Sequence, residues 1–164
     1  MNIIRSINRF VLFLLLCAIA IAAAPGVRAA TPPDEIKYAG AIPLTTDLLD
    51  KMDAFLKSMS SDAAAKAELT EIGKDPAVGT TPESWATAIN SKCPKSAANL
   101  KAAGIGADDF AKGMFAIMAC SMSADLAKSE DATVKANAEF MKANNDRATK
   151  TFGDFMQLSM PATP

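Results

Sequence analysis

Residues 110–126, FAKGMFAIMACSMSADL, decide the fold of this chain. At about 100° per residue, their apolar side chains cover most of a helical circumference, and only Lys112 and Ser123 mark a narrow polar strip. A helix that is apolar on nearly all sides needs other helices around it. We therefore expect residues 110–126 to form the central helix of an all-α bundle.

The flanking sequence supplies the other helices. Leu48, Met52 and Phe55 begin an apolar stripe of helical period, and residues 60–62 break it before it continues to Gly73. Residues 74–80 form a loop, Thr81 and a following proline begin the next helix, and the last helix covers residues 131–158. No strand pattern appears. The prediction is a single domain of four to six helices over residues 46–158, with an extended, proline-rich leader at 30–45 and a disordered tail at 159–164.

The N-terminus has the pattern of a secretory signal peptide. Arg5 and Arg9 precede an uninterrupted apolar run over residues 10–24, and small residues follow it. Cleavage after Ala29 leaves residues 30–164 as the mature chain, which we expect to be periplasmic or secreted. An uncleaved membrane anchor is disfavoured because the run falls short of about 20 residues. A lipid anchor on Cys17 is disfavoured by the bulky Leu16 before it.

Composition excludes several functional classes. The chain contains no histidine, which rules out Ser-His-Asp catalysis, His-ligated haem and ordinary zinc or copper sites. Removal of residues 1–29 leaves 14 basic against 18 acidic side chains, a net charge of −4. Such a chain has no basic field for nucleic acid. Alanine occupies 27 of the 135 remaining positions, and this composition favours helix over sheet.

Two cysteines remain in the mature chain, Cys93 and Cys120. In an oxidising compartment a pair with no leftover thiol predicts one structural disulfide. A redox-active pair is the alternative, but a separation of 27 positions does not provide the Cys-x-x-Cys spacing that lowers a thiol pKa.

The candidate binding residues lie on or near the central helix. Trp85, the single tryptophan, either covers an apolar pocket for a small lipid-like ligand or anchors a short helix to the core. Phe110, Met114, Met118 and Met122 line the same predicted pocket from the central helix. Asp125 projects into this apolar arc, where it either pairs with a lysine at the end of the bundle or lines a cavity.

Three of these methionines suggest an alternative function. Met114, Met118 and Met122 recur at four-residue steps, so their thioethers stack along one side of a helix. Soft sulfur ligands suit Cu(I), and a copper-handling protein of this kind needs no histidine. The competing interpretation is that the methionines fill an irregular helical core.

Several short motifs resemble those of a group of small secreted all-helical bacterial proteins of unknown function. They are Cys93-Pro94, the segment LKAAGI at 100–105, Asp109-Phe110 before a methionine-rich helix, and NAEFMKAN at 137–144. Together they cover about half of the mature chain. Asn144 stands where members of the group carry a histidine. The resemblance implies a bacterial envelope setting and supplies no activity.

These observations favour a non-enzymatic helical protein without a cofactor. We expect it to bind a protein partner or a small hydrophobic ligand, with no role for nucleic acid and no stable membrane insertion after signal cleavage. Cu(I) handling by the three methionines is the alternative function.

Overall fold

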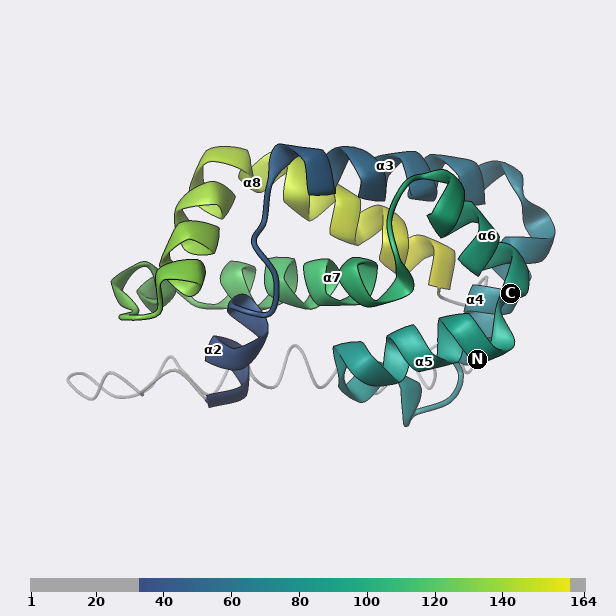
Figure 1. Cartoon of the computed structure of the whole chain (residues 1–164), viewed down its shortest axis with the longest axis horizontal. Coiled ribbons are helices and arrows are strands. Elements are labelled where there is room, and N and C mark those ends of the chain that lie inside the picture. Colours follow the sequence, from purple (N-terminus) through teal and green to yellow (C-terminus); the bar gives the residue numbers. More distant parts are fainter. Residues whose placement is uncertain (1–32, 160–164) are drawn as a thin grey trace, which may run out of the picture. The chain divides into compact units, whose positions relative to one another are not determined.

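The structure is a computed structural model that describes residues 33–159. Over that range the chain forms seven α-helices, two short 3-10 helices and no β-strand (Figure 1). The predicted all-α bundle is therefore confirmed. The helix count exceeds the expected four to six because part of the predicted leader is helical.

The elements follow one another with short connections. Their bounds are α2 Pro33–Ala39, α3 Thr46–Ser61, α4 Ala63–Ile72, η1 Val78–Thr80, α5 Pro82–Lys92, α6 Pro94–Ala102, α7 Ala107–Met122, η2 Ala124–Lys128 and α8 Ala132–Ser159.

Helix α7 occupies the centre, as its sequence predicts. It packs against α2, α5 and α8, and apolar side chains along most of its length are buried. A chain of edge-to-face aromatic contacts ties it to its neighbours. Phe110 of α7 meets Phe55 of α3 at 4.8 Å and Phe155 of α8 at 5.4 Å between ring centroids, and Phe155 meets Trp85 of α5 at 5.2 Å. Four helices thus share one aromatic core.

Side-chain caps set several helix boundaries where the sequence predicts them. Asp62 separates α3 from α4, and its carboxylate accepts hydrogen bonds from the backbone N–H groups of Ala64 and Ala65. Thr81 caps α5, with Pro82 at the first helical position. Each cap satisfies N–H groups that a helix start leaves without a partner inside the helix.

The predicted leader is helical in part. Residues 33–39 form α2 instead of the extended conformation expected for residues 30–45. The first helical position is Pro33, where the missing N–H costs nothing, and Asp34 and Glu35 lie in the favourable first turn. The prolines therefore limit the length of this helix without preventing it.

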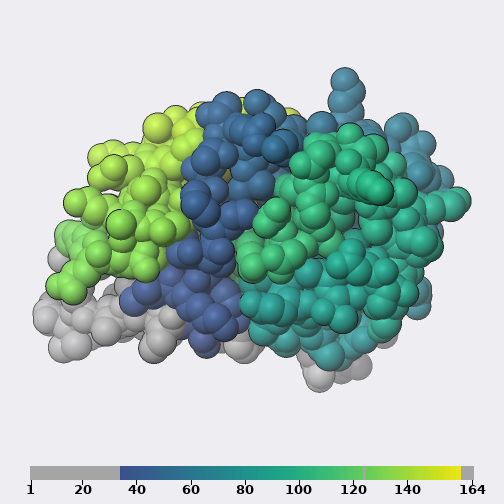
Figure 2. All heavy atoms as spheres, in the orientation of Figure 1, coloured from purple at the N-terminus to yellow at the C-terminus, as the bar shows by residue number. Residues whose placement is uncertain are grey.

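One buried side chain holds the link between α2 and α3. The Asn137 amide, 1% exposed on α8, accepts a hydrogen bond from the Leu44 N–H at 2.7 Å and donates to the carbonyls of Ala39 and Ile42. Figure 2 shows this link at the surface, between the first part of α8 and the residues that join α6 to α7. Asn137 thus supplies the backbone partners that a link without regular structure lacks.

Helix α8 is bent at Asn144. The backbone there leaves the helical region (φ −125°, ψ 21°), and the Asn144 side chain donates to the Phe140 carbonyl at 2.9 Å. Beyond the bend, α8 runs beside α3 in the same direction (Figure 1). The helix includes Ser159, one residue more than predicted, and the rest of the predicted tail lies outside the described residues.

The predicted disulfide is wrong, since Cys93 and Cys120 are both free thiols. Cys93 is the residue between the end of α5 and the start of α6. Helices α5 and α7 run in opposite directions (Figure 1). Cys120 comes thirteen residues after the start of α7 at Ala107, about 20 Å along the helix axis. A disulfide requires Cα atoms within about 7 Å. The disulfide was expected from the number of cysteines and the expected compartment, but the fold keeps Cys93 and Cys120 apart.

The predicted signal peptide, residues 1–29, lies outside the described residues. Within the described part, none of the helices is long and apolar enough to cross a bilayer.

Candidate functional site

The predicted apolar pocket is filled by its own side chains. Trp85, Phe110 and Met114 do lie together, with Phe155 and Ile89, around an internal void of about 20 Å³. A space of that size holds at most one water molecule. Trp85 therefore packs as an anchor of α5, and a lipid-like ligand at this place would have to displace core side chains.

The three methionines differ in exposure along α7. Met114 is 3% exposed, Met118 is partly buried, and Met122 is 50% exposed at the end of the helix. The structure thus distributes the thioethers among core, boundary and solvent. Among the described residues, no group of three or more Cys, Asp and Glu side chains could hold a metal ion. Cu(I) handling stays a prediction.

Asp125 does not lie on the central helix. Helix α7 ends at Met122, and Asp125 belongs to the 3-10 turn η2. The Ser121 hydroxyl donates to the Ile117 carbonyl in the last turns of α7, and the backbone becomes extended at Ser123. The Asp125 carboxylate accepts a hydrogen bond from Lys128 at 3.1 Å, which matches the ion-paired alternative of the two predicted for it.

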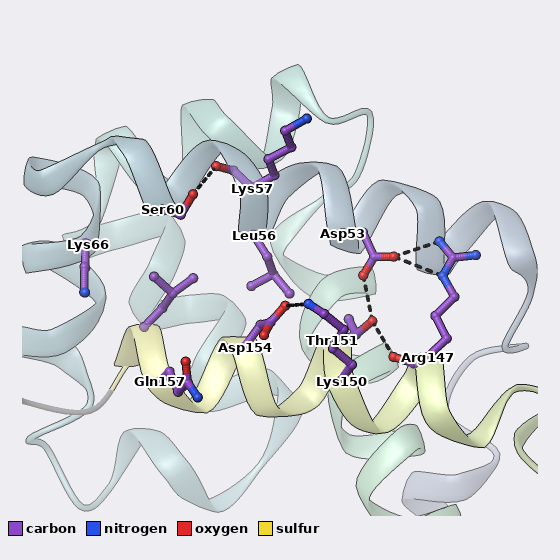
Figure 3. A pocket seen from close by; sticks show the side chains of 11 residues that line it. Asp53, Leu56, Lys57, Ser60, Lys66, Arg147, Lys150, Thr151, Asp154 and Gln157 are labelled. Atoms are coloured by element: carbon purple, nitrogen blue, oxygen red, sulfur yellow. Dashed lines mark hydrogen bonds and ion pairs between the residues drawn. The ribbon is translucent and has the colours of Figure 1, made fainter.

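A hollow in the described surface lies elsewhere, between α3 and α8. It has a volume of about 640 Å³, and we call it the α3–α8 groove (Figure 3). Two buried leucines, Leu56 and Leu158, form its floor. Its walls carry polar and charged side chains: Asp53, Lys57, Ser60, Lys66, Arg147, Lys150, Thr151, Asp154 and Gln157.

Helical spacing brings these residues to one face. On α3, Asp53, Lys57 and Ser60 follow one another at steps of four and three residues. On α8, the lining residues from Arg147 to Gln157 recur at steps of three or four. Because α3 and this part of α8 run side by side in the same direction, the two faces meet along the groove.

One end of the groove is closed by a charged clamp. The Arg147 guanidinium donates from Nε and one terminal nitrogen to Asp53, at 3.0 and 2.8 Å, and also pairs with Asp50. The buried Thr151 hydroxyl donates to the other Asp53 oxygen at 2.6 Å. Both carboxylates raise the pKa of Arg147 above its ordinary value. This end therefore carries two carboxylates around one cation.

Two other cations of the lining have no counter-charge in the described part of the chain: Lys66 of α4, at the end opposite the clamp, and Lys57, midway along the α3 wall with its side chain directed away from α8 (Figure 3). Lys57 and Lys66 make no ion pair and no side-chain hydrogen bond among the described residues, whereas Lys150, midway, pairs with Asp154. Figure 3 shows Ser60 between Lys57 and Lys66, across from Gln157 on α8. The groove lining as a whole carries four cationic and two acidic side chains, on a chain whose formal net charge is −1.

In the sequence these lysines stand singly among acids, a pattern that is typical of a solvated surface. The sequence does place charged residues on one face of α3 and on one face of α8. These two faces indicate a groove only when the two helices are known to be neighbours.

Comparison with models of protein families, with curated proteins and with solved structures finds no match to this chain.

Proposed function

We propose that this chain is an extracytoplasmic, non-enzymatic binding protein that binds a protein partner in the α3–α8 groove. The observation that carries the proposal is the groove itself, about 640 Å³ with charged walls along two parallel helices. The signal-peptide pattern of residues 1–29 supports the compartment.

The shape of the groove supports a polypeptide ligand over a small apolar one. Sites for small molecules enclose most of the ligand surface and are lined mainly by apolar side chains. Nine of the eleven lining residues here are polar or charged, and Leu56 and Leu158 expose only 4% and 8% of their surface. The apolar space beside Trp85 amounts to about 20 Å³. Of the two ligand classes expected from the sequence, the protein partner fits better.

The bonding of the groove carboxylates supports binding rather than catalysis. Asp53 accepts hydrogen bonds from Arg147 and Thr151, and Asp154 accepts one from Lys150. A general acid or base must be able to reach a substrate atom. Carboxylates held in this way act as fixed parts of the wall.

Site-specific photo-crosslinking in the producing cells tests the proposal. A photoreactive amino acid replaces Gln157 in the groove, and a matched variant carries it at Asn90, an exposed position on α5. We expect a discrete protein adduct from position 157 and none from position 90. No adduct from the groove, or the same adducts from both positions, would overturn the proposal.

A further inference from the structure

We infer that the partner presents an acidic polypeptide segment, whose carboxylates meet Lys57 and Lys66, the unpaired cations in the lining of the α3–α8 groove. The inference rests on the proposed function and adds the chemistry of the ligand. Lys57 and Lys66 are the observation behind it, because they are cations of the groove wall without a counter-charge among the described residues.

The distribution of charged side chains along the groove favours a ligand of negative charge. At the clamp end, Asp50 and Asp53 already surround Arg147, so a second anion there would face two carboxylates. Away from the clamp, Lys66 of α4 lies at the opposite end and Lys57 lies midway along the α3 wall, and neither has a counter-charge among the described residues. Charge complementarity of this kind steers encounter, and a basic segment would suffer like-charge repulsion. The groove therefore favours an acidic segment.

The dimensions suit a short stretch of chain. The α8 wall extends from Arg147 to Leu158, about 16 Å along the helix axis. An extended chain advances about 3.3 Å per residue, so about five residues cover the groove. Ser60 and Gln157 lie beside the free lysines and add uncharged hydrogen-bonding groups for the segment.

An anionic lipid carries the same sign of charge as an acidic polypeptide, but its acyl chains do not fit the groove. An acyl chain needs an apolar channel, whereas the groove floor consists of two leucines that are almost fully buried. The internal void near Trp85 is too small for an acyl chain. The acidic polypeptide is therefore the occupant that fits both the charge and the form of the groove.

A titration followed by backbone amide NMR tests the inference with a defined probe. The probe is a blocked peptide of glutamate and alanine, about six residues long, and a peptide of lysine and alanine serves as its counterpart. The double variant K57E/K66E reverses the free cations, and K101E/K135E makes the same change of net charge at exposed lysines outside the groove.

We expect the glutamate peptide to shift amide signals along the second half of α3 and the end of α8. Binding should weaken by about tenfold in K57E/K66E, as expected for the loss of two exposed charge pairs, and stay unchanged in K101E/K135E. Equal binding by both variants, no shifts in the groove, or preference for the lysine peptide would overturn the inference. Binding of phosphatidylglycerol vesicles with the same dependence on Lys57 and Lys66 would also overturn it.

The two proposals can fail separately. If position 157 still crosslinks to a discrete partner in K57E/K66E, the groove binds a protein but its free lysines do not select it. If no adduct forms at position 157 at all, the proposed function itself fails.

Discussion

The Asp53 carboxylate accepts two hydrogen bonds from Arg147, a residue 94 positions further along the chain. This contact joins α3 to the second part of α8 and so fixes the wall of the α3–α8 groove. The hydrogen bond from Thr151 to the other Asp53 oxygen and the Arg147–Asp50 pair join the same two helices.

Replacing Arg147 with alanine should lower the free energy of unfolding by about 1 kcal/mol, because a two-point contact between guanidinium and carboxylate is lost at the surface. Arg147→Lys should recover only part of the loss, since the fixed guanidinium fork donates two hydrogen bonds to one Asp53 oxygen while also pairing with Asp50, and an ammonium does not reproduce this geometry. Urea unfolding measures both. Lys142→Ala, at an exposed position of the same helix, is the control. Equal urea midpoints for Arg147→Ala and Lys142→Ala would show that the clamp contributes nothing.

Asn137→Ala should destabilise the protein by about 3 kcal/mol, because the Leu44 N–H and the carbonyls of Ala39 and Ile42 lose a buried partner. Amide hydrogen exchange should also accelerate at Leu44, which donates to Asn137 directly. Asn90→Ala, at an exposed position, should leave both quantities unchanged. Unchanged exchange at Leu44 in the Asn137 variant would contradict this account of the link between α2 and α3.

Gly73→Ala should destabilise the protein by about 1–2 kcal/mol. A Cβ atom at Gly73 would come within 2.8 Å of the Ser159 carbonyl oxygen, so α4 and the end of α8 would have to move apart. Gly79→Ala is a matched control, because nothing lies within 4 Å of the added atom. Thermal unfolding of both variants gives the comparison, and similar melting temperatures would refute the close approach at Gly73.

Alkylation under denaturing, non-reducing conditions should modify two thiols per mature chain. In the native protein, burial raises the pKa of both Cys93 and Cys120 to about 11, so alkylation at neutral pH should be far slower than in the unfolded chain. The folded state holds these protons more tightly than the unfolded state, so stability should fall as pH rises from about 9 toward 11.

Mass spectrometry after alkylation, with and without a reductant, counts the free thiols and so distinguishes free cysteines from a disulfide. A mature chain that gains no alkyl groups until it is reduced would contradict the structure and restore the disulfide.

Local signals predicted much of the fold. The apolar run of α7 produces the expected central helix. The caps at Asp62 and Thr81 and the proline at position 82 act within a few residues, and each produces the expected boundary. The sequence predicted a later end for the central helix, because its apolar pattern continues past Met122 while the backbone does not. The leader was assigned as extended from its prolines, yet Pro33 stands at the one helical position that accepts it.

The candidate site could not be predicted in the same way. The groove depends on α3 and α8 lying side by side, and that pairing is set by contacts such as Phe55–Phe110–Phe155 between distant segments. Cys93 and Cys120 failed as a predicted pair for the related reason that their separation depends on the opposite directions of α5 and α7. Trp85 and Met114 lie at the core whereas Met122 is half exposed, and sequence does not show whether a core is filled.

The most direct test of the central claim combines the groove crosslink with reversal of its free charges. The photoreactive residue at position 157 is placed in the unchanged chain, in K57E/K66E and in K101E/K135E, and adducts from the producing cells are compared. The account predicts one protein adduct that is lost in K57E/K66E and kept in K101E/K135E. An adduct of equal yield in all three chains would contradict it.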